Sequence, residues 1–280
     1  ATYVERQAEL CAIAAHNFPA LDLNHISVRN DDGVAYLEAM SPVDCIFLDP
    51  ARRNEHGGKT VAISDCEPNV AELEGLLLSK ANRIMIKLSP MLDLSQALKE
   101  LPHTQEVHII SVNNECKELL LLLGQTAPEE IPVHCVNLST KGEQEKQLFV
   151  FTREQEQHSE CSYTDTLGNY LYEPNASLLK AGAFRSIAVA YSVKKLHPNS
   201  HLYTSETQIE GFPGRTFRII NRCSLNKKEI KENLSDLKKA NITVRNFPAT
   251  VAELRKRIKL AEGGDTYLFA STLNDGQKIL

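Results

Sequence analysis

The chain has 280 residues, of which 42% are hydrophobic and 24% are charged, and its net charge is −5, which is ordinary for a globular protein long enough for two domains. No apolar run approaches the roughly 18 residues that indicate a transmembrane helix, so no membrane partner is expected. Seven cysteines without a CxxC pair favour a reducing, cytoplasmic location over a disulfide framework or a zinc site.

The charge is unevenly distributed along the chain. Residues 216–280 carry 13 Lys and Arg against 7 Asp and Glu, a surplus of +6, so residues 1–215 carry 18 against 29, or −11. A basic C-terminal module on an acidic body suggests a polyanionic partner. The alternative is a solvated, charged helical surface.

Strand-like and helix-like segments alternate through the first part of the chain. The expected strands are residues 1–5, 26–29, 43–48, 83–88 and 107–112, and the expected helices are residues 6–18, 33–40, 68–80, a short segment after Pro90, and 117–123. Residues 133–138 and 147–152 have the pattern of a closing hairpin. This alternation predicts an α/β fold with a parallel, doubly wound, Rossmann-like sheet over residues 1–152.

The sequence becomes polar around residues 153–162, which indicates a domain boundary. Residues 153–215 are expected to form a connecting, ferredoxin-like region, and residues 216–280 a small basic α+β domain. Beyond the boundary, helices are expected at 176–190, 227–240 and 250–260, and strands at 217–220, 242–245 and 267–270. The order strand, helix, strand, helix, strand in the last domain fits a sheet with helices on one face.

Asp49, Pro50, Ala51 and Arg52 follow directly after the apolar run at 43–48. Ligands of open α/β sheets bind beyond the carboxyl ends of the strands. An acid at such an end, followed by a proline that stops the strand and fixes φ, is well placed to act on a substrate. We therefore expect Asp49, Pro50 and Arg52 to be catalytic residues, with a surface ion pair as the alternative for Arg52.

The second half of the chain resembles one bacterial protein family. The similarity is carried by the motifs at 172–175 (YEPN), 196–205 (LHPNSHLYTS), 211–215 (GFPGR), 245–248 (RNFP), 253–255 (ELR) and 263–265 (GGD). Members of this family combine a methyltransferase domain, a ferredoxin-like domain and a C-terminal THUMP-like domain. THUMP domains proper bind RNA in tRNA-modifying enzymes, so the resemblance implies an RNA partner.

The first 150 residues resemble the class I S-adenosylmethionine-dependent methyltransferase fold, read from its second strand onward. Glu5 matches the acid that holds the ribose hydroxyls of the methyl donor, because a carboxylate can accept hydrogen bonds from both hydroxyls of a cis-diol. Asp31 matches the acid that accepts from the adenine amino group. A helix-start acid is the alternative for Glu5, and a helix cap is the alternative for Asp31.

Two departures from the methyltransferase pattern bear on catalysis. No glycine-rich loop precedes Glu5, so we expect the chain to be the later part of a longer protein whose first strand lies centrally in the sheet. In nucleic-acid methyltransferases the strand-end motif reads Asp/Asn-Pro-Pro-aromatic or Asp-Pro-Pro-Arg, whereas here Ala51 replaces the second proline. With Arg52 in place of an aromatic ring to stack on a flipped base, methylation of the adenine amino group becomes a weaker hypothesis.

Four cations crowd one predicted helix in the basic domain, and they are the candidate RNA-binding residues: Arg255, Lys256, Arg257 and Lys259. Such a row can follow the phosphates of a nucleic acid. The alternative is a solvated basic helix.

His197 and His201 are four residues apart, which on a helix would suit a metal ion. Pro198 and Asn199 argue against a helix there, and no third ligand is evident, so no metal site is expected. Roles in a turn and in domain packing are expected instead.

These observations favour an S-adenosylmethionine-dependent methyltransferase that acts on nucleic acid, with RNA as the expected substrate. The alternative is a non-catalytic RNA-binding protein on a degenerate methyltransferase scaffold, which Ala51 supports. A third hypothesis is a small-molecule methyltransferase with an oligomerising tail, and the +6 surplus of the tail argues against it.

Overall fold

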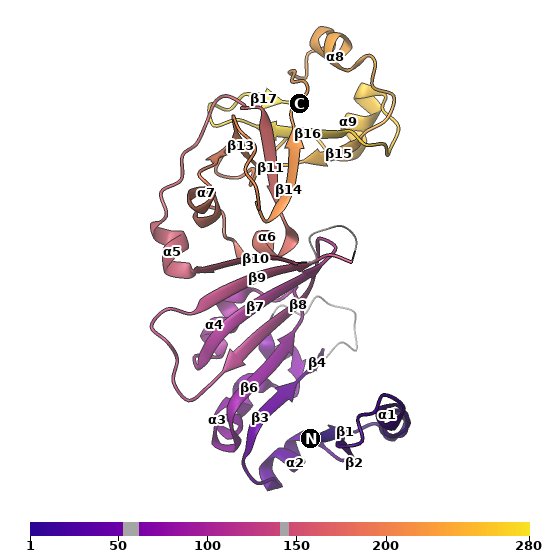
Figure 1. The fold of residues 1–280 in the computed structure, drawn as a ribbon, viewed down its shortest axis with the longest axis vertical. Coiled ribbons are helices and arrows are strands. Elements are labelled where there is room, and N and C mark those ends of the chain that lie inside the picture. The colour runs from indigo at the N-terminus through magenta and orange to yellow at the C-terminus, as the bar shows by residue number, and fades with distance from the viewer. Residues whose placement is uncertain (53–61, 141–145) are drawn as a thin grey trace. The chain divides into compact units, whose positions relative to one another are not determined.

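The computed structural model describes residues 1–52, 62–140 and 146–280 (Figure 1). It divides into two compact units. One comprises Ala1–Val107 and Glu118–Ile131, and the other comprises His108–Lys117 and Pro132–Leu280. Within the described part of the chain, no helix is both long enough and apolar enough to cross a bilayer.

The chain starts with a small parallel sheet of β1 (Thr2–Glu5) and β2 (Ser27–Asn30), with Glu5 directly opposite Asn30. Helix α1 (Ala8–Ala20) connects the two strands, and α2 (Gly33–Ala39) follows β2. The carboxylate of Asp32 caps α2, since it accepts from the backbone N–H groups of Val34 and Ala35 at 3.0 Å each. This cap fixes where the chain turns from the end of β2 into the helix.

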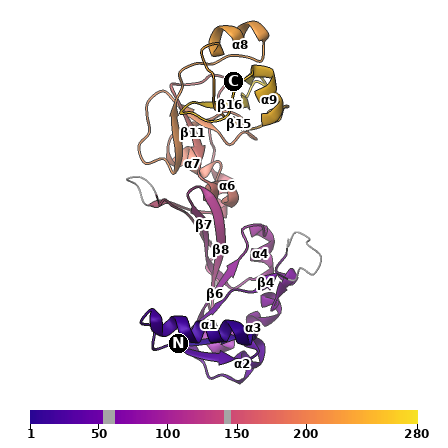
Figure 2. The same cartoon turned by 90° about the vertical axis from the view of Figure 1, so that its right-hand side faces the viewer.

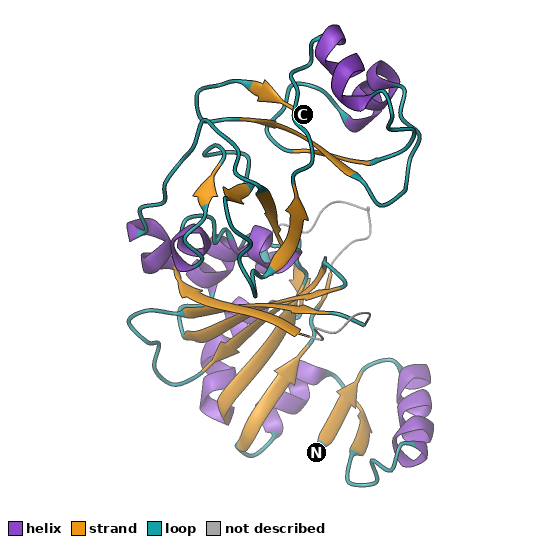
Figure 3. Cartoon of the chain, turned by 45° about the horizontal axis from the view of Figure 1, so that its top comes forward, coloured by secondary structure: helices purple, strands orange, loops and turns teal. Residues whose placement is uncertain are grey.

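A second sheet has six strands in the order β10-β9-β7-β8-β6-β3. Its members are β3 (Val43–Leu48), β6 (Ala81–Leu88), β7 (Thr104–Val112), β8 (Glu115–Leu123), β9 (Pro132–Leu138) and β10 (Lys146–Thr152). Strands β3 and β6 are parallel, whereas β8 is antiparallel to β6 and β10 is antiparallel to β9. The sheet is therefore mixed (Figure 3), so the α/β class is confirmed but the purely parallel sheet is not.

The predicted helix over 117–123 is wrong, because these residues form most of β8. Leucine favours helices by propensity. Burial alternates along the segment, however: Leu119, Leu121 and Leu123 are buried, whereas Leu120 and Leu122 are half-buried. Pairing of these leucines with β6 outweighs the local preference, as tertiary contacts often do.

Shorter elements complete the first unit. Strand β4 (Ala51–Arg52) is antiparallel to β5 (Cys66–Glu67), which follows a 3₁₀ turn at Ile63–Asp65. In the sequence, helix α3 (Val70–Lys80) precedes β6 and helix α4 (Leu94–Glu100) follows it. Asn69 and Asp93 cap them by accepting from backbone N–H groups, which accounts for their start points.

In the second unit, α5 (Arg153–His158) precedes a four-stranded antiparallel sheet of order β12-β13-β11-β14. Its strands are β11 (Tyr170–Pro174), β12 (Lys194–Lys195), β13 (Tyr203–Ser205) and β14 (Gly214–Arg218). The helix predicted over 176–190 is broken into α6 (Ala176–Ala181) and α7 (Ser186–Ala190). Gly182 ends α6 with a φ of +77°, a conformation that glycine adopts without strain.

The last segment forms a three-stranded sheet of β15 (Asn241–Val244), β16 (Tyr267–Thr272) and β17 (Lys278–Ile279). Helices α8 (Lys227–Leu234) and α9 (Val251–Ile258) bury apolar side chains in the same core as β15 and β16, and α9 lies beside β15 (Figure 2). The strand predicted at 217–220 overlaps β14, which belongs to the preceding sheet. The two sheets also share a hydrophobic core, because Leu171 on β11, Leu202 and Ile279 on β17 belong to one buried cluster.

Candidate active site

Two acids lie at the carboxyl ends of β1 and β2. The half-buried Glu5 ends β1, and the exposed Asp31 follows β2. The strand ends are joined because Asp31 N donates to the backbone oxygen of Glu5 at 3.2 Å. The side chain of Asn30 donates to the same oxygen at 3.0 Å. The predicted donor-binding acids are thus brought together at one edge of the sheet.

The structure also addresses the alternative roles of these acids. One oxygen of Glu5 accepts from Gln7 N at 2.7 Å, and Gln7 is the residue before α1, so Glu5 helps to start this helix. Asp31 accepts from Asp32 N at 2.8 Å, but the cap of α2 is Asp32 and not Asp31. Each carboxylate uses a single oxygen in these bonds, which leaves its second oxygen available to a hydroxyl or amino group of a ligand.

Asp49 lies at the carboxyl end of β3 and forms an ion pair with Lys87 near the end of the neighbouring strand β6. The Lys87 Nζ to Asp49 Oδ2 distance is 2.8 Å, and Glu118 on β8 lies 3.6 Å from the same ammonium. The hydrogen bond to Asp49 raises the pKa of Lys87, against the opposing effect of burial. The Asp49 side chain is 54% exposed, so the lysine orients the carboxylate without covering it.

Sequence reasoning missed Lys87 and Glu118. A signal was present, because Lys87 interrupts an apolar run shortly before Ser89 and Pro90, where the strand ends. In a parallel pair such as β3 and β6 the carboxyl ends lie at the same edge. A cation at the end of one strand is therefore a natural partner for an acid at the end of its neighbour.

The rest of the strand-end motif turns back as a small hairpin. Pro50 is half-buried, and the backbone of Arg52 pairs with Cys66 while that of Ala51 pairs with Glu67. Glu67 in turn accepts from Arg6, the residue after Glu5, at 3.0 Å. The ion pair is exposed, which limits its strength, but it connects the hairpin that carries the motif to the end of β1.

Strand β3 presents apolar side chains to solvent. In the described part of the chain it pairs only with β6, and Val43, Cys45 and Phe47 on one of its faces are exposed. An apolar strand with an open edge is a liability that proteins normally cover. The edge beside the candidate site is therefore suited to a further strand.

The four predicted RNA-binding residues divide into two pairs. Arg255 donates to the backbone oxygens of Ala240 and Leu260 at 3.4 Å each, and Arg257 donates to that of Leu225 at 2.8 Å. Lys256 lies on α9 and Lys259 directly after it, and both side chains are exposed. The arginines thus fix the helix end to its own domain, and the lysines present charge to solvent.

His197 and His201 both contact neighbouring residues of their own unit. His197 Nδ1 accepts from Asn199 N at 3.0 Å and lies 2.9 Å from the Asn246 amide nitrogen. The ring of His201 stacks on Phe184 with 3.6 Å between ring centres. Burial, together with the nearby charges of Lys195 and Arg245, lowers the pKa of His201 to about 4. These are turn and packing roles.

The comparisons with known proteins bear on both halves of the chain. Models of a ferredoxin-like domain and of a THUMP-like domain match residues 170–213 and 214–280. No curated protein shows significant similarity. A modification subunit of a "putative type I restriction enzyme" from Vibrio vulnificus YJ016 is 11% identical over 59% of this chain and 45% of its own, with a TM-score of 0.35, too low to support an argument.

The crystal structure of a "putative methyltransferase" from Porphyromonas gingivalis W83 is far more similar. It is 39% identical with a TM-score of 0.89, and the match covers 99% of this chain and 69% of that one. Its similarity extends over the α/β part as well as the two C-terminal domains. The chain therefore belongs to the family of this protein, in which a methyltransferase-like α/β domain precedes ferredoxin-like and THUMP-like domains.

Proposed function

We propose that the protein is an S-adenosylmethionine-dependent methyltransferase that acts on RNA in the cytoplasm. The observation that carries the proposal is the arrangement of strand-end acids within one unit. Glu5 and Asp31 end neighbouring parallel strands, and Asp49 ends β3 under the control of Lys87. Strands β1 and β2 form one sheet and β3 belongs to another. In both sheets the acids stand at the carboxyl ends of parallel strands, where ligands of α/β proteins bind.

The acids fit the methyl donor. Glu5, at a strand end with an oxygen to spare, would accept hydrogen bonds from the ribose hydroxyls. Asp32, and not Asp31, caps α2. The Asp31 carboxylate would therefore be able to accept a hydrogen bond from the adenine amino group. When bound, S-adenosylmethionine supplies an electrophilic methyl group.

Asp49 would hold the acceptor. Its carboxylate, oriented by the ammonium of Lys87 at 2.8 Å, accepts a hydrogen bond from a substrate N–H and thereby points the nitrogen lone pair along a fixed direction. Methyl transfer is an in-line displacement, so such positioning is the main contribution that side chains can make.

Among the described residues, β3 has an open edge and an exposed apolar face. The P. gingivalis protein extends beyond the match, which covers 69% of its chain. We propose that a strand and a glycine-rich loop from outside residues 1–280 complete the sheet beside β3. The strand would pair with the open edge of β3, the helix that follows the loop would cover Val43 and Phe47, and the loop would supply the remaining wall of the donor site.

Support for RNA as the substrate comes from the THUMP-like domain. It matches a domain model of that description over residues 214–280. Lys256 and Lys259 are exposed at one end of α9, where they can contact phosphates. Arg255 and Arg257 contribute less directly, because their guanidinium groups are bonded to backbone oxygens.

Calorimetric titration of S-adenosylmethionine into the full-length protein tests the donor site. We expect micromolar binding, with the affinity of Asp31→Asn about tenfold lower because a hydrogen bond to a charged group is lost. Asp22→Asn is the matched control, since Asp22 is an exposed acid of the same unit whose φ of 59° asparagine tolerates. An absence of binding at millimolar donor would leave a non-catalytic RNA-binding scaffold as the better account.

A further inference from the structure

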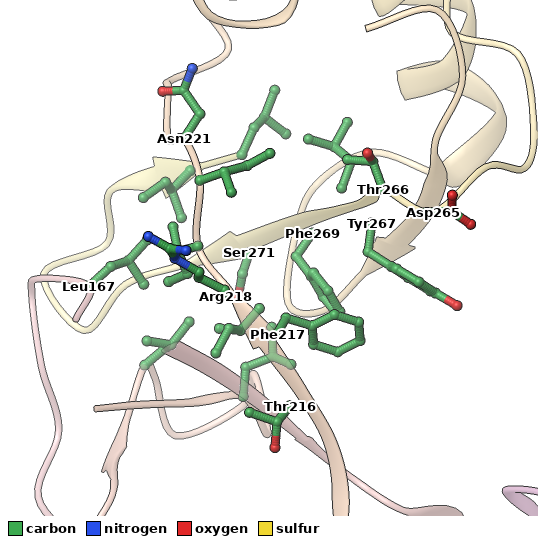
Figure 4. A pocket seen from close by; sticks show the side chains of 18 residues that line it. Leu167, Thr216, Phe217, Arg218, Asn221, Asp265, Thr266, Tyr267, Phe269 and Ser271 are labelled. Carbon is green, nitrogen blue, oxygen red and sulfur yellow. The ribbon is translucent and has the colours of Figure 1, made fainter. Parts of the chain in front are cut away.

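A cavity of about 360 Å³ lies between the ferredoxin-like and THUMP-like sheets of the second unit (Figure 4). Its walls come from β11 and β14 on one side and from β16 and β17 on the other. Ligand pockets start at roughly this size, so the space suits a small, compact group. The cavity has no part in the proposed methyl-transfer site.

Aromatic rings form one wall of the cavity. The ring centre of Phe217 lies 4.9 Å from that of Tyr267 and 4.9 Å from that of Phe269. Tyr267 is 39% exposed, so its ring is accessible from solvent, and Figure 4 shows the three rings grouped together. Exposed aromatic rings of this kind stack on planar ligands.

A buried hydroxyl in the cavity lacks a partner. Ser271 lines the space, is 2% exposed, and its Oγ forms no hydrogen bond with any described residue. Leaving a buried hydroxyl unpaired is unfavourable. A ligand with a hydrogen-bonding edge would satisfy it, whereas a purely apolar ligand would not.

Polar and cationic groups border the aromatic wall. The guanidinium carbon of Arg215 lies 5.4 Å from the ring centre of Phe217 and 5.1 Å from that of Tyr267. Arg218, Asn221 and Asp265 also line the cavity. The surrounding segment 216–280 has a surplus of six positive charges, which favours a negatively charged ligand strand.

We infer that the cavity receives an unpaired nucleobase of the bound RNA. Single-stranded bases are recognised by stacking on aromatic rings and guanidinium planes and by hydrogen bonds to their edges. The rings, the unpaired Ser271 hydroxyl and the polar residues at the cavity provide both kinds of contact. The inference rests on the proposed function, in which RNA is the partner. It further requires that the RNA contain at least one unpaired base.

The test measures binding of the full-length protein to RNA stem–loops that carry 2-aminopurine at one unpaired loop position. Stacking quenches the emission of this base, and the chain contains no tryptophan to interfere. We expect Tyr267→Ala to lower the affinity about tenfold at every salt concentration and to abolish the quenching. Tyr267→Phe should retain both, and Ser271→Ala should weaken binding several-fold.

Two comparisons make the result specific. Val189→Ala removes a 50% exposed aliphatic side chain on α7 that does not line the cavity, and it should leave affinity and emission unchanged. Lys256→Ala should lower the dependence of affinity on salt, while the quenching in the bound state stays the same.

Tyr267→Ala could bind RNA in a salt-dependent way with the same affinity and the same 2-aminopurine emission as the wild type. That result would overturn the inference and leave the proposed RNA partner intact. Displacement of the quenched base by an apolar peptide, but not by adenosine, would also overturn it and assign the cavity to a protein partner. Failure of every RNA to bind would overturn the inference together with the proposed substrate, while donor binding would still be tested by calorimetry.

Discussion

Glu173 on β11 and Asp49 after β3 are both carboxylates held by cations, but their surroundings are opposite. Glu173 is 3% exposed and binds Arg215 and Arg245, the latter at 2.9 Å. Asp49 is 54% exposed and binds the single ammonium of Lys87. The buried acid has all its strong partners inside the protein, whereas the exposed acid keeps room for a ligand.

Under the proposed function, the same ion-pair chemistry has a structural use at Glu173 and a catalytic use at Asp49. Arg215 lies on β14 and Arg245 directly follows β15, so Glu173 joins the ferredoxin-like sheet to the THUMP-like one. Removing one partner of a buried ion pair leaves uncompensated charge and is strongly destabilising. At Asp49 solvent can replace a lost partner, so a change there should affect chemistry more than folding.

The largest effect is expected for Glu173→Gln, which removes the shared charge but keeps the shape. We expect the free energy of unfolding in urea to fall by about 3 kcal/mol, the lower end of the range for broken buried pairs, because both arginines are partly exposed. Glu206→Gln, at an exposed acid that accepts from Asn169, should change it by less than about 0.5 kcal/mol. Equal effects of the two substitutions would mean that Glu173 stabilises the fold no more than an exposed acid does.

Asp49→Asn tests the other side of the comparison. We expect methyl transfer to RNA by the full-length protein to fall about 100-fold, because a positioned charged group is lost from the site. The midpoint of urea unfolding should hardly change, since the side chain is exposed. Transfer of a labelled methyl group measures the rate, and Asp44→Asn at the exposed start of β3 is the control. A full rate in Asp49→Asn would exclude Asp49 as the residue that holds the acceptor.

The sequence predicted that Asp49 follows a strand, and the structure places it there, because the strand end is a local pattern: an apolar run, an acid and a proline. Lys87 was visible in the sequence as a charge within an apolar run, but its pairing with Asp49 depends on which strands are neighbours. The same limitation explains β8, whose leucines are helix formers until β6 pairs with them. At α9 the basic pattern was visible in the sequence, but only the structure shows that Arg255 and Arg257 are bonded to backbone oxygens.

The smallest effect concerns His201, which lies near Arg245 at the buried junction. Burial lowers its pKa from 6.5 to about 4, and the charges of Lys195 and Arg245 act in the same direction. Between these two values the unfolded chain binds more protons at this residue than the folded one, so stability falls as the pH falls from 6.5 towards 4. Allowing for partial solvation, we expect about 2 kcal/mol from this group.

Urea unfolding of the wild type and of His201→Asn over this pH range measures the contribution. Asparagine tolerates the φ of 53° at this position and does not titrate, so the variant should lose less stability than the wild type as the pH falls. Parallel pH profiles for the wild type and His201→Asn would mean that His201 is protonated as readily in the folded protein as in the unfolded chain. Solvent would then screen the charges of Lys195 and Arg245 at the junction of the two sheets. In that case the buried carboxylate of Glu173 and the exposed carboxylate of Asp49 would differ less in their electrostatic surroundings than their exposed fractions indicate.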